Sequence, residues 1–352
     1  MRHALTALAI VAACLSGAHA ASAQEKTSFR IAWSIYVGWM PWGYAADAGI
    51  VDRWAEKYGI EIEVVQINDY IESINQYTAG AYDGCVMTNM DALTIPAVGG
   101  VDSTALIVGD FSNGNDGLVS KTATDLAALK GASINLVELS VSHYLLARAL
   151  ESVGLAERDL GAVVNTSDAD IVAVFTSSPD VEHVVTWNPL LAEVAAYPEA
   201  NALFDSAQIP GEIIDMMVVN TEVLDANPAF GKALVGAWYE TMATMAGDDE
   251  AAIAARTAMA KASATDLAGY DLQLDSTMMF YQPKDAVAFT TSPDLVATMD
   301  NVRKFSDRHG LLEGGVDAVG IAFPSGEILG DPDNVKLRFT DAYMKMAADG
   351  AL

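Results

Sequence analysis

The stretch that decides the fold is residues 29–67, FRIAWSIYVGWMPWGYAADAGIVDRWAEKYGIEIEVVQI. Two strand-like apolar segments, 29–36 and 60–67, enclose the segment 43–59, which is helix-like and ends on a glycine. A strand, a helix and a second strand in this order are typical of a parallel βαβ unit. This stretch therefore predicts an α/β fold.

The loop between the first strand and the helix carries two large aromatic residues. Trp39 and Trp42 lie on either side of Pro41, in a segment that has no core of its own to fill. In open α/β sheets, ligands bind beyond the carboxyl ends of the strands, which is where this loop falls. We therefore expect the two indoles to face a ligand, with packing between loop and helix as the alternative.

The alternation of strand and helix continues as far as residue 220. Strands are expected at 82–88, 103–110, 132–138, 160–166, 181–187 and 211–220, and helices at 70–80, 90–100, 122–131, 140–154, 167–175 and 188–197. From about Thr221 the pattern is largely helical. Two α/β series followed by a returning helical segment predict two lobes. Each lobe would be a mostly parallel sheet flanked by helices, with a ligand cleft between the lobes.

The chain is expected to cross between the lobes near Asp110 and again near residues 215–220. Lobe 1 is then discontinuous, formed by residues 24–110 and 216–352, and lobe 2 is residues 111–215. Polar and aromatic residues gather at the ends of the predicted strands in both series. One cleft between the lobes would bring them together.

The N-terminus reads as a secretory signal peptide over residues 1–23. A short basic start, an apolar run and small residues before Ala20 and Ala23 predict cleavage after one of these two alanines. The apolar run is too short for a membrane anchor, and lipidation at Cys14 would leave an unusually short signal sequence. We therefore expect an exported protein in which Cys85 is the single remaining cysteine. Cys85 is expected to be buried in a strand, without a disulfide or a thiolate metal cluster.

The charge balance narrows the choice of partners. The chain has 19 Lys and Arg against 47 Asp and Glu, a formal net charge of −28. Such a field repels nucleic acids and anionic membranes and attracts small cations. Adaptation to salty surroundings would account for much of the surface charge, but it says nothing about acids inside a pocket.

Several segments together resemble a known family. They are residues 36–93 with the Trp-rich loop, GDFSNGNDGLVSK at 109–121, LAALKGASINLVELSVSHYLLARALE at 126–151, VTWNPLLAE at 185–193 and FPSGEILGDPDNVKLRFTDAYMKMAADG at 323–350. From Phe29 to the C-terminus the chain looks like the nitrate/sulfonate/taurine-type periplasmic binding proteins of ABC transporters. In that family an aromatic first loop, a DxSxGxD turn and an LKG before a strand recur. The resemblance implies hinge closure on a small solute, delivery to inner-membrane permease subunits, a monomer, no cofactor, no metal and no enzymatic activity.

The Trp-rich loop and the segment at 109–121 look most like the subgroup encoded beside urea carboxylase, which is associated with urea and guanidine. That resemblance implies a guanidinium ligand. Family members for nitrate and sulfonates bind anions, whereas residues 31–50 here contain no Lys or Arg. Capture of an anion is therefore not expected.

A guanidinium ion has two chemical demands. Its flat faces favour aromatic rings through stacking and cation–π attraction, and its edges favour carboxylates that accept paired hydrogen bonds. The expected ligand-binding residues are Trp39, Trp42, Asp91, Ser112, Asp116, Glu138, Trp187 and Asp215. The alternatives are structural roles: helix capping for Asp91 and Glu138, a turn brace for Asp116, and packing for the tryptophans.

Other readings stay open beside guanidinium. Urea, another short amide or amidine, or a thiamine-type precursor would suit the same class of protein, and a neutral amide would draw on Asn89, Ser112 or Thr186. Outside that class stand an enzyme that uses the cleft and a sensor subunit. Residues 110–116 do not meet the EF-hand pattern, and the metalloprotease, phosphate-loop and hydrolase motifs are absent from the sequence.

Overall fold

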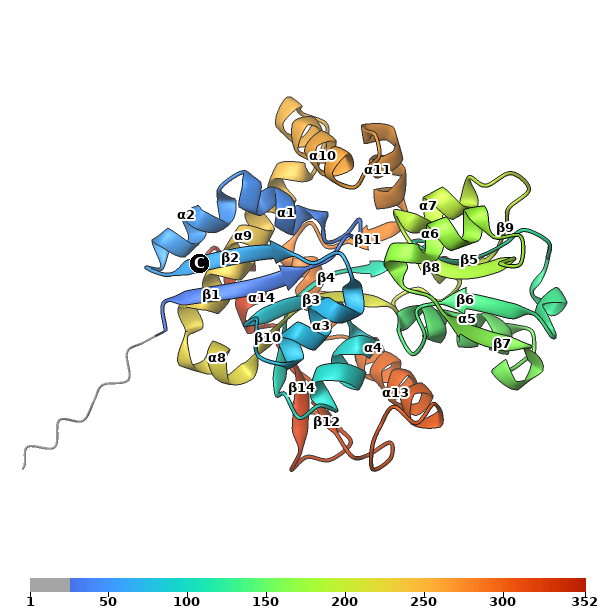
Figure 1. Cartoon of the computed structure of the whole chain (residues 1–352). Coiled ribbons are helices and arrows are strands. Elements are labelled where there is room, and N and C mark those ends of the chain that lie inside the picture. Colours follow the sequence, from blue (N-terminus) through green and yellow to red (C-terminus); the bar gives the residue numbers. More distant parts are fainter. Residues whose placement is uncertain (1–25) are drawn as a thin grey trace, which may run out of the picture.

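The computed structural model describes residues 26–352, which form two lobes (Figure 1). The larger lobe carries the blue, yellow, orange and red parts of the chain, and the smaller lobe carries the green part. The predicted signal peptide and Cys14 lie outside the described residues. None of the helices from residue 26 onward combines the length and the apolar character that crossing a bilayer requires.

The larger lobe is built on a sheet with the strand order β13-β12-β14-β4-β10-β3-β1-β2, and β11 pairs with β4 off this path. Its strands are β1 (Ser28–Trp33), β2 (Glu61–Gln66), β3 (Gly84–Thr88), β4 (Ser103–Ser112), β10 (Ile214–Asn220), β11 (Thr277–Met279), β12 (Gly320–Ala322), β13 (Ile328–Leu329) and β14 (Val335–Phe339). The strands β1, β2 and β3 are parallel, as the βαβ pattern predicts, and β10 runs antiparallel between β3 and β4.

The smaller lobe has the strand order β7-β6-β8-β5-β9. Its strands are β5 (Asp116–Ser120), β6 (Ser133–Leu136), β7 (Ala162–Asn165), β8 (His183–Trp187) and β9 (Asn201–Asp205). The strands β6, β7 and β8 are parallel, and β5 pairs antiparallel with both β8 and β9. Both sheets are therefore mixed rather than mostly parallel, because β5 and β10, the strands that follow the two crossings, run against their neighbours.

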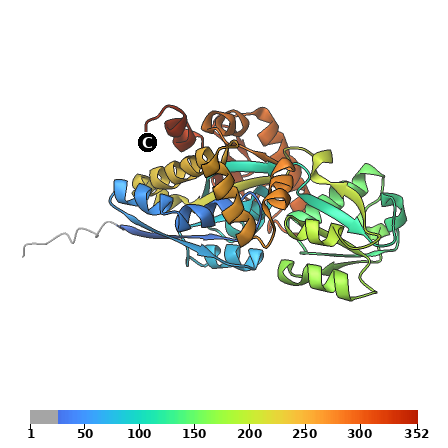
Figure 2. The ribbon, with the colours of Figure 1, turned by 90° about the horizontal axis from the view of Figure 1, so that it is seen from above.

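Helices cover the sheets of both lobes (Figure 2). They are α1 (Met40–Asp47), α2 (Ile50–Lys57), α3 (Tyr70–Thr78), α4 (Asn89–Ala92), α5 (Val141–Ser152), α6 (Asp168–Ser177), α7 (Leu190–Ala195), α8 (Thr221–Ala226), α9 (Pro228–Met245), α10 (Glu250–Ala262), α11 (Leu267–Asp275), α12 (Pro283–Thr290), α13 (Pro293–Arg308) and α14 (Ala342–Ala348). Figure 2 shows α9 running alongside α1 and α2 on one face of the larger sheet.

Three local expectations were wrong. The helix expected at 43–59 is two helices, α1 and α2, because Gly49 adopts a left-handed conformation with φ 65° between them. The first of these begins at Met40 and admits Pro41 in its first turn, so Trp42 is helical and not in a loop. The helix expected at 122–131 is only a short 3-10 turn, Leu126–Leu129. The strands β5 and β9 were not anticipated.

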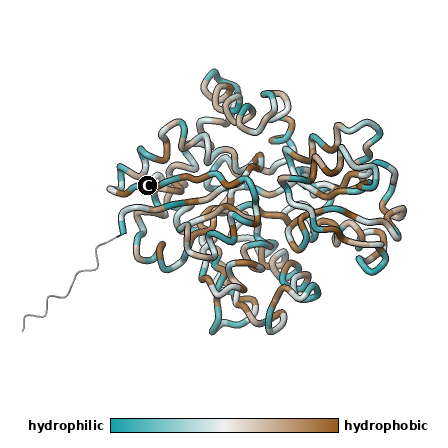
Figure 3. Tube along the Cα trace, in the orientation of Figure 1, coloured by the Kyte–Doolittle hydropathy of each residue, from teal (hydrophilic) through white to brown (hydrophobic). Residues whose placement is uncertain are grey.

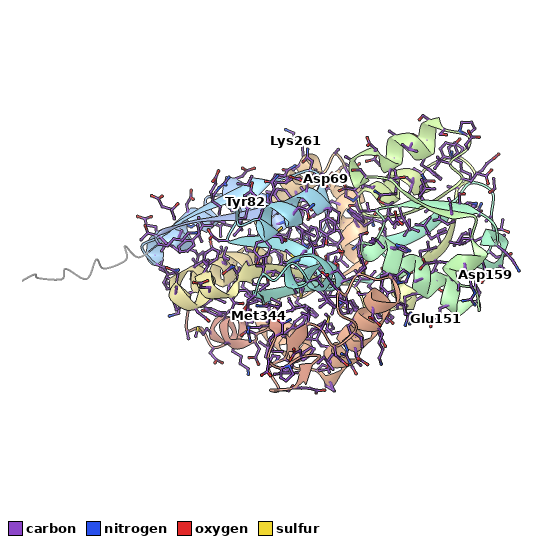
Figure 4. The ribbon with its side chains drawn as sticks, turned by 60° about the horizontal axis from the view of Figure 1, so that its bottom comes forward. Asp69, Tyr82, Glu151, Asp159, Lys261 and Met344 are labelled. Atoms are coloured by element: carbon purple, nitrogen blue, oxygen red, sulfur yellow. The ribbon has the colours of Figure 1, made fainter. Side chains whose placement is uncertain are left out.

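The two lobes share one continuous buried apolar cluster, and hydrophobic segments follow the strands of both sheets (Figure 3). Within it, Phe29 stacks on Phe230 with ring centroids 4.5 Å apart, and Trp42 stacks on Trp238 at 5.2 Å. The Cys85 thiol is fully buried, as expected, and burial raises its pKa to about 12. Acids such as Glu151 lie instead on the outer surface of the smaller lobe (Figure 4).

Candidate ligand-binding site between the lobes

A small cavity lies between the lobes and takes its lining from both. The lining residues are Tyr36, Trp39, Tyr70, Thr88, Asp116, Val141, Trp187, Ile213 and Asp215. A water-sized probe can occupy only about 10 Å³ of it, which is about the room that one water molecule needs. Side chains therefore nearly fill the cavity in this conformation, and a guest larger than water requires them to move.

Strand ends bring these side chains together. Tyr36 follows β1, Thr88 is the last residue of β3 and Trp187 is the last residue of β8. Asp116 is the first residue of β5, and Asp215 is the second residue of β10. Because β10 runs antiparallel to β3, with Asp215 paired to Thr88, its beginning lies at the carboxyl end of β3. In the smaller sheet, Asp116 pairs with Trp187 in the same way. The site thus occupies the edge where ligands of open α/β folds bind.

Four aromatic rings form a continuous chain across the lobe boundary. The ring centroids of Tyr36 and Trp39 are 5.0 Å apart, those of Trp39 and Tyr70 are 5.4 Å apart, and those of Tyr70 and Trp187 are 5.7 Å apart. The first three rings belong to the larger lobe and Trp187 to the smaller lobe. Such rings offer π-faces to a planar or positively charged guest.

Beside these rings lies a pair of buried carboxyl groups. Asp110 on β4 and Asp215 on β10 occupy facing positions in the sheet, and they are 0% and 3% exposed. The Tyr36 hydroxyl donates to Asp110 Oδ1 at 3.2 Å. Among the described residues, neither Asp110 Oδ2 nor Asp215 Oδ2 has a hydrogen-bond donor. A buried carboxylate oxygen without a donor is costly, so these two atoms are available to a ligand.

Two further acids complete the cluster. Asp91 Oδ2 accepts from the Tyr70 hydroxyl at 2.6 Å and from Thr88 Oγ1 at 2.9 Å, whereas its Oδ1 has no donor in the described part of the chain. Asp116 is 3% exposed and follows Ser112, whose hydroxyl accepts from the Asp116 backbone N–H at 3.1 Å. Asp91 and Asp116 come from different lobes, so the acids as well as the rings span the boundary.

Burial shifts all four carboxyl groups in the same direction. It raises the pKa of Asp116 to about 7 and that of Asp91 to about 6, and it raises the pKa of Asp110 as well. The pKa of Asp215 is raised well above its usual range, by burial first and then by the charges of Asp110 and Asp116. Hydrogen bonds from Tyr36, Ser112 and Tyr70 oppose these shifts only in part.

None of the ion pairs formed within residues 26–352 involves these four acids. Buried carboxylates in proteins are normally paired with a cation or hydrogen-bonded throughout. The cluster is therefore built to be neutralised by protons or by a cation that enters the cavity.

A second cavity shares Trp39 and Asp215 with the first, which we call the front cavity. The second cavity leaves about 10 Å³ for a water-sized probe, and Trp42, Asp110 and Trp238 line it together with apolar residues of the core. The indole N–H groups of Trp39 and Trp238 are buried and have no acceptor in the described part of the chain. Trp42 therefore supports the back of the acid pair rather than the front cavity.

The expected site residues divide into three groups. Trp39, Asp116, Trp187 and Asp215 line the front cavity. Asp91, Trp42 and Ser112 lie just behind it, and the Ser112 hydroxyl is 2.6 Å from that of Ser206.

Glu138 lies outside the site, which corrects the expectation. Its side chain is exposed, because the chain turns outward at Leu139, which has a positive φ of 62°. Val141, the first residue of α5, borders the cavity in its place.

Sequence reasoning missed Tyr36, Tyr70, Thr88 and Asp110. Tyr36 ends the first predicted strand and Asp110 ends a later one, but neither was expected to contact a ligand. The signal available for Asp110 was its position opposite Asp215, which requires the pairing of β4 with β10. Nothing in the sequence pattern marks Tyr70 and Thr88 as site residues. Their hydroxyl groups gain a role only because they donate to Asp91 and both residues line the cavity.

One other cluster has the composition of a metal site. His143, Glu157 and His309 place a ligand atom each within 4.8 Å of one another. The backbone N–H of Leu139 donates to His143 Nδ1 at 3.1 Å, so the proton of this imidazole lies on Nε2, facing Glu157 at 3.0 Å. His309 Nε2 is 2.6 Å from Glu157 Oε1, and this contact raises the pKa of His309. A proton on His143 Nε2 leaves that nitrogen no lone pair for a metal ion, and the contact between His309 and Glu157 fits an ion pair between the lobes.

Comparison with known proteins identifies the architecture. No protein-family model and no curated protein sequence matches the chain. The alkanesulfonate-binding protein SsuA from Xanthomonas axonopodis pv. citri, solved bound to MOPS, superimposes with a TM-score of 0.66 at 17% identity, over 83% of this chain and 96% of that chain. The periplasmic nitrate-binding protein NrtA from Synechocystis PCC 6803 gives 0.58 at 14% identity, over 92% and 99%.

An enzyme shares the same architecture. The desulfurization enzyme DSZB superimposes with a TM-score of 0.57 at 14% identity, over 82% of this chain and 95% of that chain. Identities this low establish the fold and leave the ligand open. The predicted fold class is confirmed: the chain has the two-lobed α/β fold of periplasmic binding proteins.

Proposed function

We propose that this protein is the periplasmic solute-binding component of an ABC importer and that its solute is a small planar cation, guanidinium. The observation that carries the proposal is the set of four buried carboxyl groups without a basic partner, beside a chain of four aromatic rings between the lobes. Carboxylates bind the edges of a guanidinium ion and aromatic rings bind its faces.

The charge of the cavity argues against the ligands of the compared binding proteins. Sulfonate and nitrate are anions, and the lining of this cavity contains Asp116 and Asp215 but no Lys, Arg or His. An anion would meet like charges at short range in a medium of low dielectric constant. The same fold would thus serve a ligand of opposite charge.

A neutral amide such as urea is the alternative within the same class. Of the partners expected for it, Asn89 donates to the Glu212 carbonyl and accepts from the Ile214 N–H, and Ser112 is engaged with Ser206. Of these three residues, Thr186 alone keeps a buried hydroxyl without a hydrogen-bond partner in the described part of the chain. Because the polar groups of Asn89 and Ser112 are already hydrogen-bonded within the protein, the site favours a cation over a neutral amide.

Hinge closure would couple capture to delivery. The two chain crossings between β4 and β5 and between β9 and β10 are short, and we propose the two lobes as the moving units. Because β4 runs to Ser112 and β10 begins at Ile214, both in the larger sheet, Asp215 moves with the larger lobe and not, as the expected boundary had it, with the smaller one. A ligand held by Asp215 from one lobe and by Asp116 and Trp187 from the other stabilises the closed form. Permease subunits at the inner membrane would then recognise that form.

The test is calorimetry with the mature chain and with guanidinium, methylguanidinium, urea, taurine and nitrate at micromolar concentrations, where guanidinium does not denature. Guanidinium should bind, and taurine and nitrate should not. Trp187→Leu should weaken guanidinium binding by about 2- to 30-fold, the equivalent of one cation–π contact. Trp54→Leu, which changes a tryptophan of α2 outside the cavity, is the control. Binding of taurine or nitrate without guanidinium, or turnover of any of these compounds, would reject the proposal.

A further inference from the structure

The contact between Asp110 and Asp215 needs a proton. Asp110 and Asp215 are partners across the antiparallel strands β4 and β10, and both side chains are buried. Partners of this kind place their Cβ atoms about 5 Å apart on one face of the sheet, and two ionised carboxylates that close together in a buried site repel strongly. One of the two must carry a proton when no other cation is present.

The surroundings of the pair supply no positive charge. Two titratable groups near the pair influence its protonation: Tyr36, from the loop after β1, and Asp116, from β5. Two further phenols are close enough to feel the charge of Asp110: Tyr270 on α11 and Tyr281 after β11. Asp91 from α4 acts on Asp116 in turn. Arg256 on α10 is engaged elsewhere: it contacts Asp271 at 2.7 Å and the Met245 carbonyl at 2.8 Å. Every group that faces the pair is therefore an acid or a neutral phenol.

We propose that the captured cation takes the place of the proton held between Asp110 and Asp215, so that binding one cation releases about one proton to the solvent. The inference rests on the proposed function, because it takes the cavity beside Asp215 as the ligand site. In the exchange, the O–H bond of the pair breaks, the proton passes to water or buffer, and the cation remains between ionised carboxylates. No other bond changes.

This exchange would also determine specificity. A neutral amide has no charge with which to replace the proton, so it would bind to the protonated pair and accept a hydrogen bond from it. Guanidinium binding should then strengthen with pH, whereas urea binding should not. The ratio of the two affinities should rise by up to about tenfold per pH unit while the pair titrates, since one proton is exchanged.

The number of released protons can be counted directly. Guanidinium chloride is titrated into the mature chain at pH 7 in phosphate and in Tris, whose ionisation enthalpies differ widely. The dependence of the observed binding enthalpy on the buffer gives the proton count, which should be about one. Between pH 5.5 and 8.5 the Kd for guanidinium should fall by up to about tenfold per unit at the acidic end and then level off.

Two variants locate the proton. In Asp110→Asn the amide can donate to Asp215 where the proton was, so proton release should fall towards zero and the pH dependence of the Kd should flatten. Asp215→Asn is the reciprocal change if the first variant does not fold. Asp168→Asn is the control: this acid is also buried at the lobe boundary, where it accepts from the Tyr70 N–H at 3.3 Å, but it lies on α6 outside the cavity. Its proton release should match that of the parent.

The outcomes are distinguishable. Release of about one proton that is lost in Asp110→Asn supports the exchange. Binding of guanidinium with no proton release and a constant Kd overturns it while the proposed function stands. Release that persists in Asp110→Asn overturns it by placing the proton at another acid. Absence of guanidinium binding overturns the exchange and the proposed function together.

Discussion

Replacing Asp116 by asparagine should stabilise the ligand-free protein, and the gain should grow with pH. Burial raises the pKa of Asp116 from 3.8 to about 7. Between these two values the folded state holds a proton that the unfolded state has lost, so the free energy of unfolding falls as pH rises. Below pH 4 both states are protonated and the group costs nothing. Above pH 7 the folded protein bears the full cost of a buried charge.

The magnitude follows from the size of the shift. A rise of about 3 pKa units corresponds to about 4 kcal/mol at pH 8, at about 1.36 kcal/mol per unit. A chain of this length unfolds with an entropy of about 2.1 cal/mol/K per residue, so about 4 kcal/mol amounts to about 6 °C in melting temperature. Asp116→Asn should therefore melt several degrees above the parent at pH 8 and at nearly the same temperature at pH 4.

The assay is differential scanning calorimetry of dialysed protein in sodium buffers at pH 4, 6 and 8. Heat is preferable to denaturants here, because guanidinium and urea are both candidate ligands. Asp180→Asn makes the same chemical change at an exposed position, and it should shift the melting temperature by less than a degree or so at any pH. A lower melting temperature for Asp116→Asn at pH 8, or a gain that does not change with pH, would refute the reasoning.

Two further predictions concern the support of the site. Gly38→Ala would place a Cβ 2.5 Å from Asp110 Oδ2 and 2.7 Å from the Tyr36 ring, so it should cost about 1–3 kcal/mol and weaken guanidinium binding; an unchanged melting curve and Kd would contradict the close approach. Glu157→Gln should remove the ion pair with His309 and cost about 1 kcal/mol at pH 6 by thermal melting. The pKa of His309 is raised and that of Glu157 is lowered to about 2, so the ion pair stabilises the fold in full between about pH 4.5 and 6.5. The difference in melting temperature between parent and variant should shrink as the pH rises beyond the pKa of His309. A difference that does not change with pH would argue against the pair.

The sequence predicted the architecture where its signals were periodic and local. Apolar segments between turn signals identified β1, β2 and β10. The sequence pattern did not predict features that depend on the backbone angle of a single residue. The left-handed Gly49 splits the first helix, and nothing in the periodicity distinguishes it from a tolerated helical glycine.

The site was predictable in kind but not in detail. Trp39, Asp116, Trp187 and Asp215 were expected because polar and aromatic residues at strand ends meet at one edge of a sheet. Asp110 was missed as a ligand because its meaning depends on pairing with a strand about one hundred residues later, which single-sequence patterns do not reveal. Glu138 satisfied the strand-end rule and still points into solvent, because the rule does not fix the direction of a side chain after the strand has ended.

The distribution of acids across the boundary has a consequence for closure. Asp116 belongs to the smaller lobe, whereas Asp91, Asp110 and Asp215 belong to the larger lobe, so closing the lobes brings like charges together. Two ionised carboxylates 4 Å apart repel each other by about 4 kcal/mol at an effective dielectric constant near 20, and a cation at the same distance is attracted by a similar amount to each carboxylate. A ligand shifts an equilibrium only by its difference in affinity for the two states. A cation has that difference through its charge, whereas a neutral molecule of the same shape must obtain it from contacts alone. The charge that makes the site selective is therefore also the charge that would drive the lobes together.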